Sequence, residues 1–310
     1  MSDGQDSETL MGRQALDAVA VQLRGLHGNS VNTMLFYGSC LRSNDPFEGI
    51  VDLYLLVDSY DTFYRHKIKA FGNWLLPPNV FYREFDVGHS TIRVKYGVLS
   101  ITDLRHGLSG RWIHSYLWGR FSQPVDILWC RDESLRTTIE ACLQQAAATF
   151  LTRILPRVPD SGLVSELWEQ GLRLSYSAEL RSEGIDRAKE LVAFALEHYV
   201  SVSKAVAPVS RYRLQITGSG TSARYTASVA GRSRIAGYWA WALRRVLGKF
   251  LSLARLIKAL FTFEGGLDYA VWKLERHSGQ SIEIPERVRR HPLIFVWPLF
   301  WRLYRRGVIR

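Results

Sequence analysis

The sequence predicts an α+β protein: a mixed sheet with flanking helices, followed by a helical region and a basic amphipathic C-terminal region. Three observations support this order. Strand-like stretches concentrate in the first 130 residues, helical spacing dominates afterwards, and all the excess positive charge lies in the last quarter of the chain. With 310 residues, 47% hydrophobic and 22% charged, the composition is that of an ordered globular protein large enough for two domains.

The first predicted domain, residues 1–130, contains four strand-like stretches and two helix-like ones. Leucine and valine spaced among charges predict a helix over residues 7–26. A second helix is predicted over residues 61–76, where Pro77 and Pro78 stop it. The strands are predicted in "VNTMLFYGS", "GIVDLYLLVD", "NVFYREF" and "STIRVKYGVLSI".

The second predicted domain, residues 131–230, is mostly helical. Its helices are predicted in "SLRTTIEACLQQAAATFLTRIL" and "GLVSELWEQGLRLSYSAELR", each ended by Pro or Gly. Residues 206–228 are low in apolar content and rich in Ser and Gly, so they are predicted to form a linker or mobile loop.

The third predicted part, residues 231–310, carries 16 Lys/Arg and five Asp/Glu, whereas the first 230 residues balance at 24 of each. An anionic partner, either nucleic acid or lipid, is therefore expected at this part of the chain. In residues 238–261, apolar side chains fall within one arc of a helix and basic side chains fall opposite. Two interpretations stay open for this helix: an ordinary core helix with a solvated basic face, or an interfacial membrane helix.

The final segment joins a Trp/Phe/Leu run to a basic end, and we expect it to contact an anionic membrane surface. The membrane-contacting residues are expected to be Arg289, Arg290, Phe295, Trp297, Phe300, Trp301, Arg302, Arg305 and Arg306. Three scattered cysteines form neither a disulfide framework nor a metal cluster. With no apolar run long enough to span a bilayer and no targeting presequence, a peripheral protein on the cytoplasmic side of a membrane is expected.

The stretch "FYGSCLRSNDPFEGIVDLYLLVD" points to chemistry. Gly38 and Ser39 follow one strand and Asp52 interrupts the next, which is the arrangement by which nucleotidyltransferases hold a nucleoside triphosphate and Mg²⁺. A buried strand carboxylate is costly unless it is paired or binds a metal. A second acid is usual two residues on, where this chain has Tyr54. Asp58 is a further candidate metal ligand, but it lies about 20 Å along a straight strand and would reach the site only if the chain turned.

The alternative interpretation of this stretch is a capped strand end with an incidental Asp. Four ordered blocks argue against it: "YGSC…VDLYLLVD", "IRVKYGVLSITDL", "YLWGRFSQPV" and "LSYSAELR". Together they resemble the Tam41-type phosphatidate cytidylyltransferases, a nucleotidyltransferase family, over about residues 35–183. That family tolerates an apolar or aromatic residue where Tyr54 stands. The departures are Cys40 for a second glycine, Ser122-Gln123 for a Gln-Lys pair and Glu179 for an Asp.

The resemblance implies a nucleotidyltransferase fold, a winged-helix-like second domain and a peripheral membrane enzyme that makes CDP-diacylglycerol and pyrophosphate from CTP and phosphatidic acid with Mg²⁺. Each implied role also has a structural alternative: Lys95 could be a solvated strand residue, and Glu179 and Arg181 could be exposed charges on a helix. The residues implied for catalysis or nucleotide binding are Tyr37, Gly38, Ser39, Asp52 as the metal carboxylate, Lys95, Tyr176, Glu179 and Arg181.

Two other functions remain open at this point. One is a nucleotidyltransferase acting on a nucleic acid end, although the bulky aliphatic residues of the basic region argue against nucleic acid as a partner. The other is a non-catalytic membrane or DNA adaptor with a degenerate nucleotidyltransferase domain, which the single strand acid favours. The sequence predicts no particular oligomeric state.

Overall fold

The fold is described from a computed structural model, which covers residues 2–179, 185–263 and the single positions 266, 269, 272, 275 and 276. Arg181 and the whole membrane-contacting set from Arg289 to Arg306 lie outside the described residues, so those predictions are not addressed by the structure.

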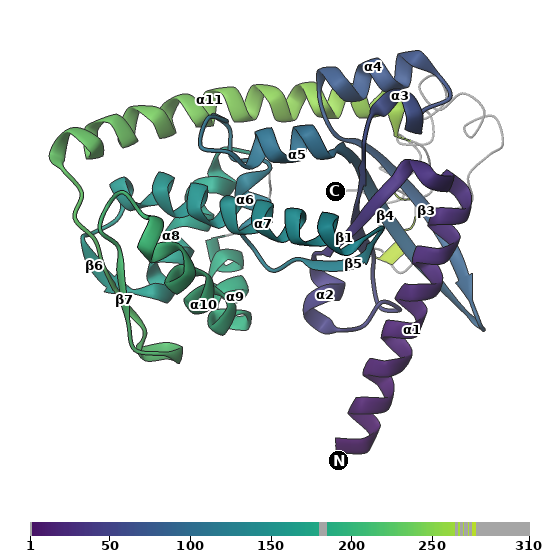
Figure 1. Ribbon diagram of the computed structural model, residues 1–310, viewed down its shortest axis with the longest axis horizontal. Coiled ribbons are helices and arrows are strands. Elements are labelled where there is room, and N and C mark those ends of the chain that lie inside the picture. Colours follow the sequence, from purple (N-terminus) through teal and green to yellow (C-terminus); the bar gives the residue numbers. More distant parts are fainter. Residues whose placement is uncertain are drawn as a thin grey trace, which may run out of the picture.

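Five strands form the main sheet, in the order β3-β4-β2-β1-β5 (Figure 1). The strands are β1 (Val31–Tyr37), β2 (Val51–Val57), β3 (Asn79–Val87), β4 (Ser90–Ser100) and β5 (Asp126–Cys130). Strands β2 and β4 are parallel and the other neighbours are antiparallel, so the sheet is mixed. The predicted α+β class, with a mixed sheet and flanking helices, is confirmed. The sequence prediction missed β5.

Each face of this sheet is covered by helices. Val19 and Leu23 of α1 (Ser2–His27) pack on one face, in a core with Met34 and Leu53. On the other face, Leu56 lies in a core that continues into the helical region. The helices of that second face are α5 (Ile101–Leu108), α6 (Trp118–Phe121) and α7 (Glu133–Ile154).

The alternation of β2 decides where its one carboxylate points. Leu53 and Leu55 belong to the α1 side, whereas Tyr54 and Leu56 belong to the helical side. Because side chains alternate along a strand, Asp52 is on the same side as Tyr54 and Leu56. Asp52 therefore faces the helical region rather than α1.

The helical region contains a second, smaller sheet. Its helices are α7, α8 (Val164–Ser177), α9 (Ile185–Phe194) and α10 (Leu196–Val206). Its strands, in the order β6-β8-β7, are β6 (Ser161–Leu163), β7 (Gln215–Thr217) and β8 (Arg224–Thr226). The predicted linker over residues 206–228 is therefore wrong. Tyr212, Leu214 and Tyr225 are buried and anchor this polar stretch, which is why it is ordered despite its low apolar content.

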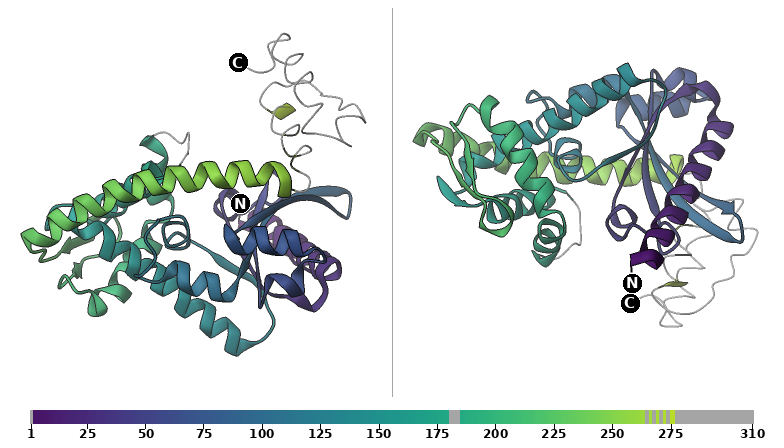
Figure 2. Two further views of the ribbon diagram at one scale, coloured as in Figure 1. Left: turned by 90° about the horizontal axis from the view of Figure 1, so that it is seen from above. Right: turned by 60° about the horizontal axis from the view of Figure 1, so that its bottom comes forward.

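The predicted helix over residues 61–76 is split in two. It forms α3 (Tyr60–Phe63) and α4 (Lys67–Leu75). The short helix α2 (Ser39–Ser43) precedes both in the chain. The last helix, α11 (Gly231–Thr262), runs along the whole length of the molecule from the helical region to α4 (Figures 1 and 2). None of the described helices is both long and apolar enough to cross a membrane.

Candidate functional site

Three neighbouring strands bring the predicted site residues side by side. Tyr37, the last residue of β1, pairs with Asp52 in β2, and Asp52 pairs with Lys95 in β4. Directly paired residues of adjacent strands point to the same face of a sheet. The register thus places a phenol, a carboxylate and an ammonium group in one row across the sheet.

Asp52 and Lys95 form an ion pair in this row. The Nζ atom of Lys95 lies 2.6 Å from Oδ1 of Asp52, and both side chains are less than one-third exposed. Burial alone would lower the pKa of Lys95, but the Asp52 carboxylate raises it above its ordinary value. Lys95 is therefore a permanent cation next to a carboxylate. Burial, together with the charge of Asp52, raises the pKa of Tyr37 to about 12.

Gly38 forms the turn that leads from β1 into α2. Its φ of +96° and ψ of −156° lie in a region that is almost restricted to glycine. A Cβ atom at this position would be 2.7 Å from Oδ2 of Asp52. Both the backbone conformation and the close approach of the turn to Asp52 thus require glycine at this position.

These residues line a cavity of about 320 Å³ between the sheet and the helical region. Among the described residues that line it, Asp52 is the only acid, whereas four side chains are cationic: Arg42, Lys95, Arg120 and Arg187. The other lining residues include the predicted Tyr37, Gly38, Ser39 and Tyr176, with Leu191 from α9. Such a cavity favours a ligand that carries several negative charges.

Arg120 of α6 is one of three cavity cations that the sequence analysis did not assign to the site, with Arg42 and Arg187. Its guanidinium carbon lies 5.3 Å from the ring centroids of both Tyr37 and Tyr116. Burial would lower its pKa, but the surrounding groups, Tyr54 first among them, raise it well above the ordinary value. The signal was available, because Arg120 is part of the "GRFSQPV" block.

Tyr176 reaches the cavity from α8, as the resemblance implies. Its hydroxyl donates to Oε1 of Gln123 at 2.9 Å, and Nε2 of Gln123 donates to the carbonyl of Gly119 at 2.9 Å. Gln123 occupies the place of the family's lysine and here connects α8 to α6. Glu179 does not line the cavity, although its charge contributes to the raised pKa of Arg120.

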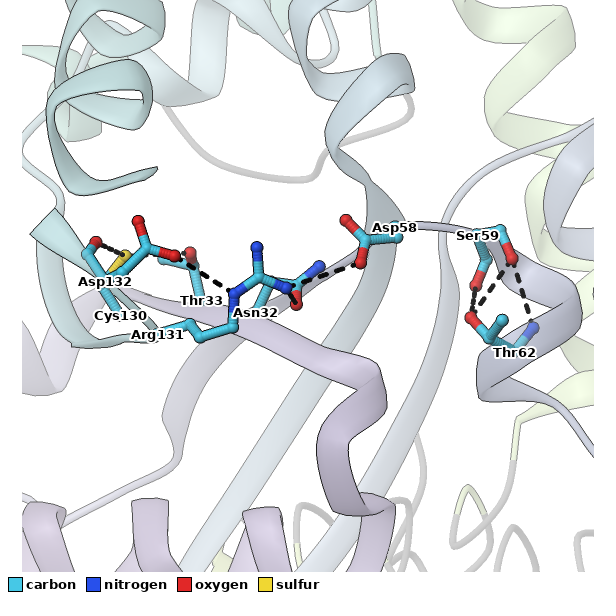
Figure 3. A network of polar contacts seen from close by, with 8 residues as sticks. All are labelled: Asn32, Thr33, Asp58, Ser59, Thr62, Cys130, Arg131 and Asp132. Carbon is cyan, nitrogen blue, oxygen red and sulfur yellow. Dashed lines mark hydrogen bonds and ion pairs between the residues drawn. The ribbon is translucent and has the colours of Figure 1, made fainter. Parts of the chain in front are cut away.

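The structure does not bring Asp58 to the cavity. Strand β2 ends at Val57, and Asp58 directly after it is exposed, with Oδ2 located 3.7 Å from Nη1 of Arg131 (Figure 3). Arg131 in turn donates to Oδ1 of Asn32 at 2.7 Å and lies 3.2 Å from Asp132. Asp58 thus belongs to a separate surface network at the opposite end of the strand from Asp52. The expectation that it could join the site as a metal ligand is corrected.

Tyr54 takes the position of the usual second acid and has a structural role. It is buried, its ring lies 5.2 Å from that of Tyr37 and 5.0 Å from that of Phe121, and its hydroxyl is 3.2 Å from that of Tyr116. Its ring therefore packs against Tyr37 and helps to fix the position of that side chain. Asp52 is therefore the only acidic residue in β2.

The side chains near Asp52 determine which kind of Mg²⁺ site is possible. Within the part of the chain that the structure describes, no group of three or more His, Cys, Asp or Glu side chains is arranged to hold a metal ion. Mg²⁺ usually takes only one or two carboxylates and completes its shell with water and substrate phosphates. Asp52, which lines the cavity next to Gly38, fits that second kind of site.

A carboxylate on a mixed sheet, a glycine turn beside it and a cation-rich cavity together define a nucleotidyltransferase-like protein. Residues 60–202 match the model of the family described as "Phosphatidate cytidylyltransferase, mitochondrial", so the resemblance to the Tam41-type enzymes is confirmed over this part of the chain. The "YGSC" turn and Asp52 precede the matched residues.

The chain is also similar to solved structures. One of them, a nucleotidyltransferase-like protein from Exiguobacterium sibiricum, is 11% identical, with a TM-score of 0.27, and the match covers 70% of this chain and 99% of that one. No curated protein matches the chain.

Proposed function

We propose that the protein is a CTP:phosphatidate cytidylyltransferase, which makes CDP-diacylglycerol and pyrophosphate from CTP and phosphatidic acid. The observation that carries the proposal is the cavity, in which four cationic side chains surround the single carboxylate of Asp52. Three of the four, Lys95, Arg120 and Arg187, lie within the residues that match the cytidylyltransferase family. The two substrates are a triphosphate and a phosphate monoester, so the enzyme must hold two anions together.

The reaction needs charge neutralisation more than proton transfer. A phosphate monoester has a second pKa of about 6, so the phosphatidate oxygen is largely ready to attack without a general base. That oxygen forms a bond to the α-phosphorus of CTP while the bond to the pyrophosphate oxygen breaks. The cations would hold the two anions in line and stabilise the charge that develops on the leaving pyrophosphate.

The residues divide this task according to their positions. Lys95 and Arg120 keep their charge at any working pH, because their pKa values are raised. Gly38 allows the β1–α2 turn to approach the phosphates closely. Asp52 would hold Mg²⁺, which when bound supplies positive charge to the triphosphate. Leu191 of α9 and Ala195, which follows it, provide an apolar wall on which the cytosine and ribose would rest.

Membrane attachment is part of the proposal, because phosphatidic acid is a membrane lipid. We expect a peripheral enzyme on the cytoplasmic side of a membrane, with Mg²⁺ as cofactor and without a nucleic acid partner. The contact predicted for the segment from Arg289 to Arg306 stays a prediction.

The test incubates the purified protein with Mg²⁺, labelled CTP and liposomes that contain phosphatidic acid. Labelled CDP-diacylglycerol should form, and Lys95→Met and Arg120→Met should each reduce its rate by about 100-fold or more, since each removes one charge aimed at the transferring group. Arg131→Met is the matched control, because Arg131 lies in the exposed network of Figure 3, and it should keep the full rate.

Two results would overturn the proposal. If the label were transferred only to an RNA or DNA end, the protein would be a nucleic acid nucleotidyltransferase. If no acceptor were labelled while liposome binding persisted, it would be a non-catalytic adaptor.

A further inference from the structure

Helix α11 presents its apolar side to solvent. Trp239 and Phe250 are each 67% exposed, although a globular protein normally buries such side chains. The exposed large apolar residues of α11 are Ile235, Tyr238, Trp239, Leu243, Val246, Phe250, Leu253, Leu256 and Ile257. Of the two interpretations that the sequence left open, the core helix with a solvated basic face is wrong.

Three cations of α11 are turned toward the protein and fixed there by hydrogen bonds. Arg244 is only 3% exposed and donates to the carbonyl of Ile113 at 2.7 Å. Arg255 donates to the carbonyl of Pro77 at 3.2 Å, and Lys258 donates to that of Pro78 at 2.9 Å. A rotation of the helix that buried its apolar side would break all three contacts, so the exposure of that side is built into the fold.

Close packing reinforces this orientation. A Cβ atom on Gly248 would overlap the carbonyl oxygen of Ala178, so the glycine lets α11 touch the segment that follows α8. Trp241 is buried and its indole N–H donates to the carbonyl of Arg153 at 2.9 Å.

Helix α4 repeats the inverted pattern. Ile68 is 85% exposed and Trp74 is 63% exposed, with Phe71 and Leu75 also exposed. The inward side holds a polar residue, Asn73, whose amide donates to the carbonyl of Val98 at 3.0 Å. Two neighbouring helices thus turn apolar side chains to solvent.

The two helices meet at one edge of the molecule. Figure 1 shows α4 next to the C-terminal end of α11. The contact is made by the segment directly after α4, since Arg255 and Lys258 of α11 bind the carbonyls of Pro77 and Pro78. We name the exposed apolar residues of both helices the α4/α11 surface.

Charge identifies the partner of this surface. There is no Asp or Glu from residue 62 to 83, which includes α4, and none from residue 198 to 263, which includes α11. Exposed cations accompany the apolar residues, among them Lys67, Arg245 and Lys249. Aromatic and aliphatic side chains next to cations, without acids, are suited to the boundary of an anionic bilayer.

We propose that the α4/α11 surface docks on an anionic lipid bilayer, with its apolar side chains in the headgroup boundary and its cations against the lipid phosphates. A second copy of this chain is disfavoured, because cations would face cations. Residues 277–310 of the same chain are disfavoured as the partner for the same reason, because they are also rich in arginine. The docking does not depend on the proposed function. Only the idea that docking supplies the lipid substrate rests on it.

The test measures co-sedimentation of the full chain with vesicles of phosphatidylcholine, with or without phosphatidylglycerol. Phosphatidylglycerol is anionic but is not the proposed substrate, so the readout is independent of activity. The variants are Phe71→Glu/Trp74→Glu in α4 and Val246→Glu/Phe250→Glu in α11. Each pair should weaken binding to the anionic vesicles by roughly 100-fold, about tenfold for each apolar side chain kept out of the bilayer. High salt should weaken wild-type binding as well.

Val21→Glu is the matched control, since Val21 is 64% exposed on another helix, α1, and should leave binding unchanged. Substitutions of exposed residues should barely change the unfolding midpoint, which checks that the variants are folded. The variants should still convert a short-chain, water-soluble phosphatidic acid at the wild-type rate.

Unchanged vesicle binding in both pairs would overturn the proposal. A full-chain Trp297→Glu/Trp301→Glu variant then shows whether the C-terminal segment alone binds the bilayer. Loss of a concentration-dependent dimer in the α4 and α11 variants, with vesicle binding retained, would overturn it in favour of a second copy. Failure of every variant and the wild type to make CDP-diacylglycerol would instead contradict the proposed function and leave the docking intact.

Discussion

Replacement of Gly38 by Ala is the most direct perturbation of the candidate site, because it adds one methyl group at the point where the turn meets Asp52. The added carbon would lie 2.7 Å from Oδ2 and 3.2 Å from Cβ of Asp52. Alanine would also have to adopt φ of +96° and ψ of −156°. The substitution therefore imposes both backbone strain and an overlap with the carboxylate.

The size of the effect follows from these two contributions. A non-glycine residue in this backbone region costs about 1–3 kcal/mol. If the overlap moves Asp52 away from Lys95, it also weakens a partly buried ion pair, which adds about 1 kcal/mol. We expect the free energy of unfolding to fall by about 2–4 kcal/mol. The cytidylyl transfer rate should fall by about 100-fold, the loss typical of a displacement near 1 Å at a catalytic group.

Urea unfolding and the CDP-diacylglycerol assay measure these two quantities. The matched control is Gly88→Ala in the β3–β4 turn, where φ is +62° and no atom lies within 4 Å of the added carbon. This control carries backbone strain without an overlap. It should lose about 1–2 kcal/mol of stability and none of the transfer rate.

A double-mutant cycle isolates the overlap. In an Asp52→Ala background the carboxylate oxygens are gone, so Gly38→Ala should cost less than it does in the wild type. An equal cost in both backgrounds would show that the turn does not press on Asp52. A Gly38→Ala protein that kept the wild-type transfer rate would refute the placement of the phosphates at this turn.

The remaining predictions use other groups. Asp58→Asn should leave the transfer rate within about twofold and change stability by less than about 1 kcal/mol, because Asp58 belongs to an exposed ion pair; a rate loss like that of an Asp52 variant would restore it as a metal ligand. Asp52→Asn removes the charge that raises the pKa of Lys95, so burial should then lower that pKa and make Lys95 more reactive toward amine reagents, which mass spectrometry can quantify against wild type. Burial and Arg255 lower the pKa of His114 to about 3 from 6.5. The unfolded state therefore binds more protons in this window, and stability falls as the pH falls through it. His114→Gln should make that fall shallower in urea unfolding measured across the window, and an unchanged slope would contradict the assignment.

The row of Tyr37, Asp52 and Lys95 shows how far sequence reasoning could reach. Each residue was identified by its motif, and each strand by its β-branched and leucine content. The register that sets the three residues side by side was not accessible, because it depends on β4 pairing parallel to β2 across residues 58–89, a long-range choice that no local pattern encodes.

Asp58 and Arg120 illustrate the opposite errors. Strand alternation put Asp58 on the same side as Asp52, but distance along the strand separates them, and only the path of the chain after Val57 could show this. Arg120 lies in a short helix next to a glycine, and its local sequence does not indicate what it contacts. Its contacts with Tyr37 and Tyr116 join residues more than 80 positions apart in one case, so only the fold reveals them.

The orientation of α11 was beyond the sequence for a different reason. Periodicity separates an apolar side from a basic side, but it does not say which one faces the protein. In the structure, the carbonyl groups of Ile113, Pro77 and Pro78 accept hydrogen bonds from basic side chains of α11 and so fix its orientation.

The same helix also connects the two walls of the cavity. Near its start, Arg234 lies 2.7 Å from Asp160 and Trp241 binds the carbonyl of Arg153, both in the helical region. Near its end, Lys258 binds the segment between α4 and β3, in the sheet domain. The cavity is formed by residues of both parts, so its shape depends on how firmly α11 holds them. A bilayer that binds the outer side of α11 would therefore act on the element that sets the distance between the sheet carboxylate and the helices opposite it.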